Sequence, residues 1–522
     1  MIVRSLYLSA AYLLCVSAGV AQSAAPVNST ARRAERSHVE RFSTPEMRAE
    51  RSESETTAKL TANPDDAEAL NARALARLRL GRYQEAHEDL RRAVTLKPNN
   101  SEYQANFGYA LWKLGRAEEA IGAERVALRL DDKNFTAHFQ LGRFLLRFGS
   151  PEQLKEAAAH LRRALELDPR QYDVRFELIA AHRTLGETAQ AVAQLDLLQD
   201  ARPSDPRVTY VAALLAADHG DLNSAISNFR DALNRDPGLF GAWQDLGLAY
   251  VKLKRWPEAV AAFAELARRQ PTSAEVAYFH ALSLYNTGQA EEAEREVRRA
   301  LRQQAGAAEA HTLLGIILAS RGPAANAEAT DALAQAVALA PQSFDAHFYL
   351  GRVQYAAKDY AGAVKSLRAA VGLGPRHGEA RFFLGTALED AGESAAAMNE
   401  YQELVKLDEK SAVGQLGLGA LLVKQGKTGE AVAALKRATA LDAKNFEAHW
   451  ALGRALALGE HYAEAVAALQ AAVTLAPARS DAHYQLGLAL RRLGRSAEAA
   501  REFAIVERLN REFRTSTTAP KP

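Results

Sequence analysis

The sequence contains a single cysteine, Cys15, and it lacks any strong excess of one charge sign. One cysteine excludes intrachain disulfides and zinc sites built from several thiolates. Because 65 Lys and Arg residues balance 63 Asp and Glu residues, the composition argues against dedicated nucleic-acid binding, which needs a strongly basic surface. Burial of apolar surface must therefore stabilise the chain, and its 48% hydrophobic and 25% charged residues suit an ordinary folded protein.

Long apolar runs are also missing, apart from one short run near the N-terminus. This run, Leu6 to Val20, follows Arg4 and is followed by Ala21. Its 15 residues fall short of the about 18 that favour a membrane-spanning helix. We interpret residues 1–21 as a cleavable signal peptide, with an uncleaved anchor as the alternative, and expect a periplasmic or extracellular protein. Residues 22–44, with Ser, Thr, Ala and alternating Arg and Glu, are expected to form a flexible lead-in.

What the sequence does contain is a repeat. An alanine recurs every 34 residues, with one insertion of three residues and one of two: Ala86, Ala120, Ala157, Ala191, Ala225, Ala259, Ala293, Ala329, Ala363, Ala397, Ala431, Ala465 and Ala499. A small residue precedes this anchor by twelve positions in nearly every repeat. Each repeat has two apolar-periodic segments separated by a glycine or polar break and closed by a proline or polar turn. This pattern predicts an all-α stack of helical hairpins.

The repeat that begins at Phe240 carries the motif most clearly: Trp243, Leu246, Gly247, Tyr250, Ala259, Phe263 and Pro271. This pattern resembles that of tetratricopeptide repeats. The resemblance covers residues 67–513 as thirteen repeats: 67–100, 101–134, 135–171, 172–205, 206–239, 240–273, 274–307, 308–343, 344–377, 378–411, 412–445, 446–479 and 480–513. It implies an α-solenoid, a right-handed superhelix whose concave groove is lined by the first helix of each repeat.

Both ends of the repeat array are expected to be solvated. Residues 45–66 resemble a degenerate second helix that caps the first repeat. Residues 514–522 are expected to form a disordered tail.

Signatures of catalysis are missing from the sequence. It has no phosphate-binding glycine loop, no His-Glu-x-x-His and no Gly-x-Ser-x-Gly motif, and too few residues lie outside the repeats for a catalytic domain. We therefore predict no enzyme, no catalytic residue and no cofactor. A histidine recurs at the fourth position of five repeats, and we favour packing over a metal site because neighbouring helices lie too far apart to share an ion: His138, His311, His347, His449 and His483.

The fifth position is the predicted site of partner binding. It is aromatic in eight repeats: Phe139, Phe176, Tyr210, Tyr278, Phe348, Phe382, Trp450 and Tyr484. In three of them an arginine follows four residues later, one helical turn from the ring: Arg143, Arg352 and Arg454. In the resembled family this position faces the concave groove, so these eleven residues are the predicted partner groove. The alternative is that the rings pack between neighbouring first helices.

Together these features predict an exported scaffold or adaptor that binds protein or peptide segments in its groove. The alternative is a structural component of an envelope secretion or exopolysaccharide-export assembly. We expect no nucleic acid and no small-molecule substrate, and membrane contact only indirectly through partners.

Overall fold

The computed structural model describes residues 44–518, with side chains described through Glu512. The predicted signal peptide (1–21) and all of the predicted lead-in except Thr44 lie outside these residues. Within the described range there are 27 α-helices, one short 3-10 helix and no strand. None of the described helices combines the length and the apolar character needed to cross a membrane. The chain divides after Gln270 into an N-terminal body and a C-terminal body.

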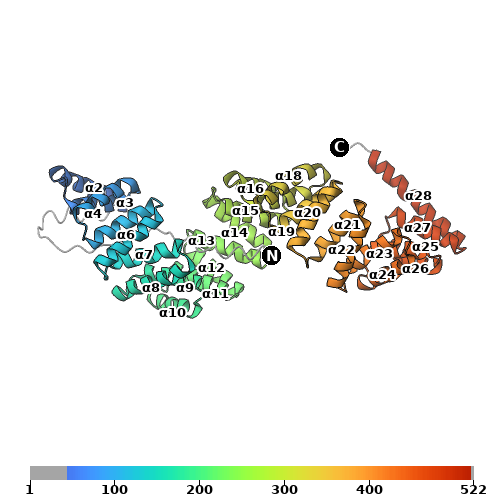
Figure 1. Cartoon of the computed structure of the whole chain (residues 1–522), viewed down its shortest axis with the longest axis horizontal. Coiled ribbons are helices and arrows are strands. Elements are labelled where there is room, and N and C mark those ends of the chain that lie inside the picture. Colours follow the sequence, from blue (N-terminus) through green and yellow to red (C-terminus); the bar gives the residue numbers. More distant parts are fainter. Residues whose placement is uncertain (1–43, 519–522) are drawn as a thin grey trace. The chain divides into compact units, whose positions relative to one another are not determined.

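The N-terminal body consists of one leading helix and six helical hairpins, coloured blue to green in Figure 1. The leading helix is α2 (Pro45–Ala62). The hairpins are α3 (Ala67–Arg79) with α4 (Tyr83–Leu96), α5 (Ser101–Lys113) with α6 (Ala117–Leu130), α7 (Phe135–Phe148) with α8 (Pro151–Leu167), α9 (Tyr172–Thr184) with α10 (Thr188–Ala201), α11 (Pro206–Asp218) with α12 (Leu222–Arg235), and α13 (Phe240–Lys252) with α14 (Trp256–Arg269).

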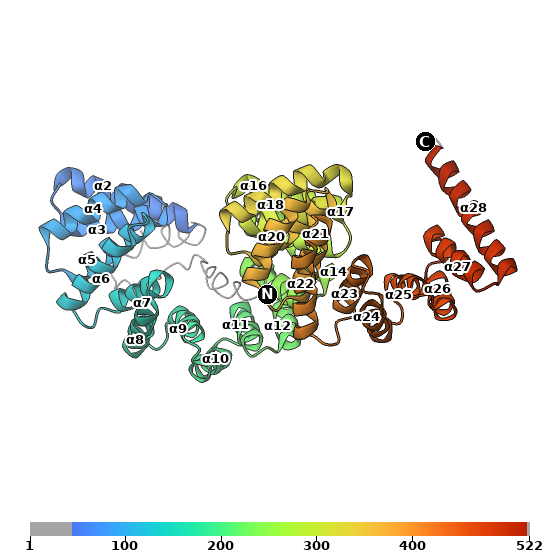
Figure 2. The ribbon, with the colours of Figure 1, turned by 45° about the vertical axis from the view of Figure 1, so that its right-hand side comes forward.

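The C-terminal body contains seven more hairpins, coloured from green to red in Figure 2. They are α15 (Ala274–Asn286) with α16 (Ala290–Gln303), α17 (Ala308–Ser320) with α18 (Asn326–Leu339), α19 (Phe344–Ala356) with α20 (Tyr360–Leu373), α21 (Gly378–Asp390) with α22 (Ser394–Leu407), α23 (Ala412–Lys424) with α24 (Thr428–Leu441), α25 (Phe446–Leu458) with α26 (Tyr462–Leu475), and α27 (Ser480–Arg492) with α28 (Ser496–Thr518). The 3-10 helix η2 (Pro323–Ala325) occupies the insertion between α17 and α18.

Local sequence signals fix where the helices begin and end. Many first helices start after a short polar residue, and Asn134 is typical because its Oδ1 accepts a hydrogen bond from the Ala137 N–H at 2.9 Å. In most repeats the turn from the first to the second helix contains a left-handed residue, which in the tenth repeat is Gly392 with φ 84°. Lys254 and Lys358 adopt the same left-handed conformation, although they lack the conformational freedom of glycine.

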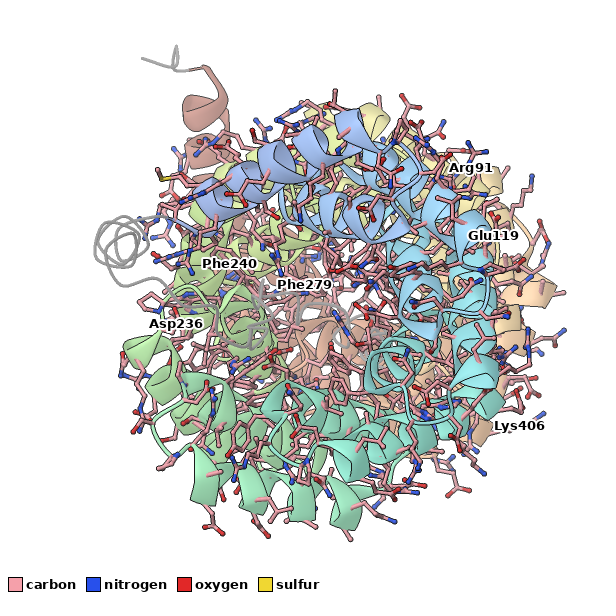
Figure 3. All side chains as sticks on the ribbon, turned by 90° about the vertical axis from the view of Figure 1, so that its left-hand side faces the viewer. Arg91, Glu119, Asp236, Phe240, Phe279 and Lys406 are labelled. Atoms are coloured by element: carbon pink, nitrogen blue, oxygen red, sulfur yellow. The ribbon has the colours of Figure 1, made fainter. Side chains whose placement is uncertain are left out.

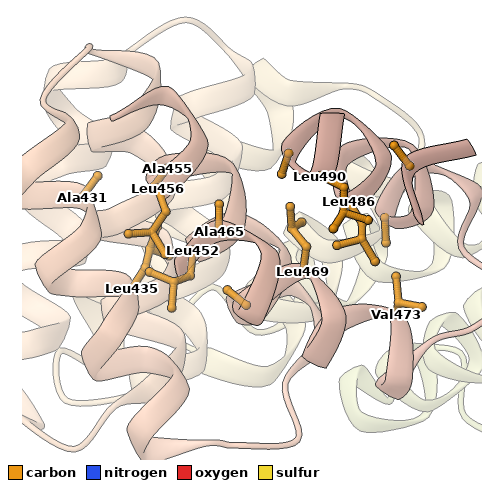
Figure 4. Close-up of a cluster of buried hydrophobic side chains, with 14 of the residues drawn as sticks. Ala431, Leu435, Leu452, Ala455, Leu456, Ala465, Leu469, Val473, Leu486 and Leu490 are labelled. Carbon is orange, nitrogen blue, oxygen red and sulfur yellow. The ribbon is translucent and has the colours of Figure 1, made fainter. Parts of the chain in front are cut away.

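Close packing of small against large side chains holds each hairpin together. The anchor alanine is 0% exposed in twelve repeats and 2% exposed in the last. Twelve residues earlier, glycine faces a large residue on the second helix; a Cβ on Gly419 would lie 2.6 Å from Leu435 Cγ. Leu435 and Leu469 belong to one buried cluster that continues from repeat to repeat (Figure 4). Charged side chains such as Arg91 and Glu119 are exposed on the second helices (Figure 3).

The two ends of the array differ. At the N-terminal end α2 buries Leu60, and its Glu53 accepts hydrogen bonds from Arg77 and Arg82. At the C-terminal end the predicted tail is wrong for residues 514–518, because α28 continues through Thr518. No proline or glycine lies between the start of α28 and Thr518, so the sequence contains no residue that would break this helix earlier.

Candidate functional site

The fifth-position rings differ widely in exposure. Three are buried, namely Phe176 (5% exposed), Tyr210 (4%) and Phe348 (4%). Phe139, Tyr278, Phe382 and Trp450 are half-buried, and Tyr484 is 47% exposed. The prediction that all eight rings line an accessible groove is therefore wrong for Phe176, Tyr210 and Phe348.

Side chains from neighbouring helices cover the buried rings. The Tyr210 hydroxyl donates a hydrogen bond to Asp245 Oδ2 on the next first helix at 2.7 Å. Burial, and secondarily this carboxylate, raise the pKa of Tyr210 well above its ordinary value of 10.0, so the hydroxyl stays a neutral donor. Tyr484 is not covered in this way, because no first helix of a further repeat follows α27 in the described chain.

Phe348 lies in a group of rings rather than on open surface. Its centroid is 5.6 Å from that of Phe344, 5.5 Å from His377 and 6.1 Å from Phe383. His377 and Phe383 belong to the turn and the first helix that follow. For Phe348 the packing interpretation, which the sequence left open, is therefore the correct one.

The three arginines lie beside their rings, as the spacing predicted, but they are not equally available. Arg143 is 5.2 Å from the Phe139 centroid and forms an ion pair with Glu177 of the next repeat at 3.1 Å. Arg352 is 5.5 Å from the Phe348 centroid and 3.7 Å from a Glu379 carboxylate oxygen.

The Trp450 and Arg454 pair is the most accessible of the three. The Arg454 guanidinium lies 4.6 Å from the Trp450 ring centroid. Arg454 is exposed, and no carboxylate in the described part of the chain pairs with it. The Trp450 side chain is half-buried, and its indole Nε1 is itself buried, without a hydrogen-bond partner among the described residues. This pair therefore offers the exposed part of an apolar ring and a free cation together.

The recurring histidines have a structural role that the sequence reasoning missed. In each case Nε2 lies within hydrogen-bond distance of a backbone carbonyl six residues earlier, as in His347 to Pro341 O at 3.1 Å and His449 to Ala443 O at 3.1 Å. Since a carbonyl only accepts, Nε2 carries the proton and donates. Trp243 makes the same bond through Nε1 to Pro237 O at 3.1 Å. In these six repeats the fourth position therefore ties the first helix to the turn before it.

One pocket opens between α21, the end of α22 and the start of α23. We call it the Gly378 pocket; its volume is about 550 Å³. It is lined by apolar side chains with charged residues at its rim: Arg376, Gly378, Glu379, Phe382, Phe383, Leu404, Leu407, Asp408, Ser411 and Val413. Phe382 is the one predicted groove residue among them. The sequence signal for the pocket was glycine at the first position of a repeat, where five other repeats carry Phe or Tyr.

Comparison with known families assigns the repeats. Tetratricopeptide repeat models match residues 55–101, 71–135, 150–215, 216–283, 278–330, 325–376, 356–412 and 457–510, and a further TPR repeat model matches 419–459. The chain belongs to the tetratricopeptide repeat family. Its fold is the α-solenoid that the resemblance implied, built from the helical hairpins that the 34-residue periodicity predicted.

Individual tetratricopeptide repeat proteins are only distantly similar. Mouse DnaJ homolog subfamily C member 7 is 25% identical over 203 residues, which is 39% of this chain and 36% of that protein. The BBSome complex member BBS4 homolog of Drosophila melanogaster is 20% identical over 281 residues, 46% of this chain and 58% of that protein. The chain thus spans less than two thirds of either relative. The crystal structure of the APC/C hetero-tetramer Cut9-Hcn1 aligns with 90% of this chain and 95% of that chain at 15% identity and TM-score 0.41.

Within the tetratricopeptide repeat array, the structure brings only part of the predicted groove together. Phe382 and Arg352 lie in one neighbourhood, because Arg352 is 4.9 Å from the ring of Phe383, a lining residue of the Gly378 pocket. Trp450 and Arg454 form a separate pair on α25. The candidate site therefore consists of local patches along the first helices of the C-terminal body.

Proposed function

We propose that this chain is an exported scaffold that binds segments of other proteins through the first helices of its repeats. The observation that carries the proposal is the Trp450 and Arg454 pair. A ring beside an unpaired guanidinium can hold an apolar side chain while the cation binds a carboxylate or a backbone carbonyl. The family assignment supports a role in protein–protein interaction.

Arg454→Ala combined with Trp450→Leu is expected to weaken partner binding at least tenfold, since aromatic and arginine side chains dominate interface energies. The leucine keeps apolar volume in the half-buried site, and Arg454 has no ion pair to lose, so the melting temperature should change little. The partner is first identified by mild crosslinking and copurification. Affinity is then measured with the purified partner by titration calorimetry.

Two controls make the result specific. Arg437→Ala removes an exposed arginine from the second helix α24 and should leave affinity unchanged. Phe348→Ala removes a ring that is 4% exposed, so it should lower thermal stability without changing the affinity of the folded fraction. Unaltered binding by the Trp450 and Arg454 variant would contradict the proposed surface. Recovery of one stoichiometric membrane complex, instead of separable clients, would favour an envelope-assembly component.

Export is the second part of the proposal. It is supported by Arg4, the apolar run from Leu6 to Val20 and the small residue Ala21. N-terminal sequencing of the mature protein from its producing cell is expected to begin near Gln22. Recovery of intact Met1 from a membrane fraction would instead indicate an anchor.

A further inference from the structure

We infer that the Gly378 pocket receives an aromatic side chain from a bound protein segment. This inference rests on the proposed scaffold function and names the chemistry of its partner. The evidence comes from the other repeats, several of which fill the equivalent space with a ring of their own.

The ninth repeat shows how the space is filled. Its first residue, Phe344, stacks on Phe348 at the fifth position with centroids 5.6 Å apart, and it lies 4.6 Å from the ring of His377 at position 34. A Cβ on Gly374, at position 31, would be only 2.9 Å from the Phe344 ring. The ring of Phe344 therefore occupies a slot bounded by positions 5, 31 and 34.

The same slot takes a ring in other repeats. In the fourth, the guanidinium of Arg202 at position 31 lies 4.5 Å from the Tyr172 ring centroid. In the twelfth, the guanidinium of Arg479 at position 34 lies 4.4 Å from that of Phe446. Tyr172 and Phe446 are both first residues of their repeats. The slot is thus shaped for an aromatic group in repeats of quite different sequence.

The tenth repeat has the slot without the ring. Its first residue is Gly378, and positions 5, 31 and 34 are Phe382, Asp408 and Ser411, all of which line the pocket. The α21, α22 and α23 ribbons that surround it lie next to one another in Figure 2. The pocket is therefore the counterpart of the space that Phe344 fills one repeat earlier.

The walls and the rim suit an aromatic guest. Leu404 is 2% exposed at the base, while Leu407 and Val413 are 41% and 40% exposed at the opening. A volume of about 550 Å³ is ample for one side chain. An aromatic ring would cover these apolar side chains and gain contact area with little loss of rotamer freedom.

The charges at the rim indicate which kind of residue lies next to the aromatic side chain in the bound segment. Glu379 lies 3.7 Å from Arg352, and Asp408 Oδ1 accepts a hydrogen bond from the Lys410 N–H at 3.0 Å. Arg376 is exposed and has no ion pair within the described chain. We therefore expect the guest to be Phe, Tyr or Trp next to a carboxylate that pairs with Arg376.

Gly378→Phe tests the inference, because it supplies from within the chain the ring that a partner would otherwise provide. An added Cβ would meet Leu404 Cδ1 at 3.1 Å, so the change needs a shift of only a few tenths of an ångström. A phage-displayed peptide library is selected on the full chain, and the dissociation constants of synthetic copies of the selected peptides are measured. We expect the peptides to share an aromatic residue and to lose at least tenfold in affinity on Gly378→Phe.

Gly372→Phe is the matched control, since Gly372 is an exposed helical glycine of the same body with open space around it. It should leave affinity unchanged. If Gly378→Phe unfolds the chain, Val413→Glu replaces it, because a charge at this exposed rim position should repel the ring without disturbing the core. Peptides that bind both pocket variants as tightly as the unaltered chain would overturn the pocket assignment while leaving the scaffold proposal standing. Failure to find any peptide or protein partner would overturn both.

Discussion

Replacing Glu124 with leucine is expected to stabilise the N-terminal body, by about 1–3 kcal/mol at pH 4 and by more at pH 8. Glu124 lies on α6, is 0% exposed, and neither of its carboxylate oxygens has a hydrogen-bond partner in the described chain. Its neighbour across the hairpin is Gly108, where a Cβ would be 2.5 Å from Glu124 Oε1. The next repeat has the same arrangement with leucine, since a Cβ on Gly142 would lie 2.6 Å from Leu161 Cγ. Leucine therefore fits this space.

The pH dependence follows from the direction of the pKa shift. Burial alone raises the pKa of the Glu124 carboxyl well above its ordinary value of 4.5. Below about pH 4.5 the group is protonated in both the folded and the unfolded chain. As the pH rises further, the unfolded chain loses this proton while the folded chain keeps it, so the folded state binds more protons and stability falls. The fall ends once the pH passes the raised pKa of the folded state.

The measurement is the midpoint of urea unfolding at several pH values from 4 to 8. The gain from Glu124→Leu should grow across this range. Glu124→Gln is the control, because it keeps an unpartnered polar group but has no proton to lose; its gain should also rise with pH yet stay below that of leucine at each pH. A gain from leucine that is the same at pH 4 and pH 8 would contradict a buried, protonated carboxyl.

The regular part of the fold could be predicted because its causes are local or repeat at fixed spacing. Ala259 and Gly247 recur at fixed places in the 34-residue pattern that predicted the helical hairpins. The structure packs both closely, with Ala259 0% exposed and an added Cβ on Gly247 only 2.6 Å from the Phe263 ring. The end of α28 was harder to place, because nothing between 514 and Pro520 actively stops a helix.

The site was less predictable because exposure depends on the neighbouring repeat. Tyr210 and Tyr484 hold the same position, yet Asp245 meets the first and no described first helix follows the second. The Gly378 pocket arises from a side chain that is missing. Such a feature becomes visible only when the ring of Phe344 is seen in the equivalent space.

Tyr401→Ala is expected to cost the C-terminal body about 3–5 kcal/mol of unfolding free energy, the range for deleting a large buried aromatic side chain. Tyr401 on α22 is 2% exposed. Its ring stands between two glycines on flanking first helices, since an added Cβ on Gly385 or on Gly417 would lie 2.6 or 2.5 Å from Cε1. The ring thus fills the gap between two successive repeats.

Tyr401→Phe separates the ring from its hydroxyl. The hydroxyl lies 3.2 Å from Thr386 Oγ1 and 3.3 Å from Glu389 Oε2, so its loss should cost only about 1 kcal/mol.

Gly417→Ala should cost about 1–3 kcal/mol by overpacking against the ring. In the Tyr401→Ala background the same change should cost much less, because the ring it would strike is gone. Urea unfolding of the four variants gives this coupling directly, and additive costs would show that the Tyr401 ring does not pack against Gly417 on α23. The Phe382 ring, which lines the Gly378 pocket, lies 6.2 Å from the Tyr401 ring. Tyr401→Ala should therefore also weaken binding of the aromatic peptides that were selected on the full chain.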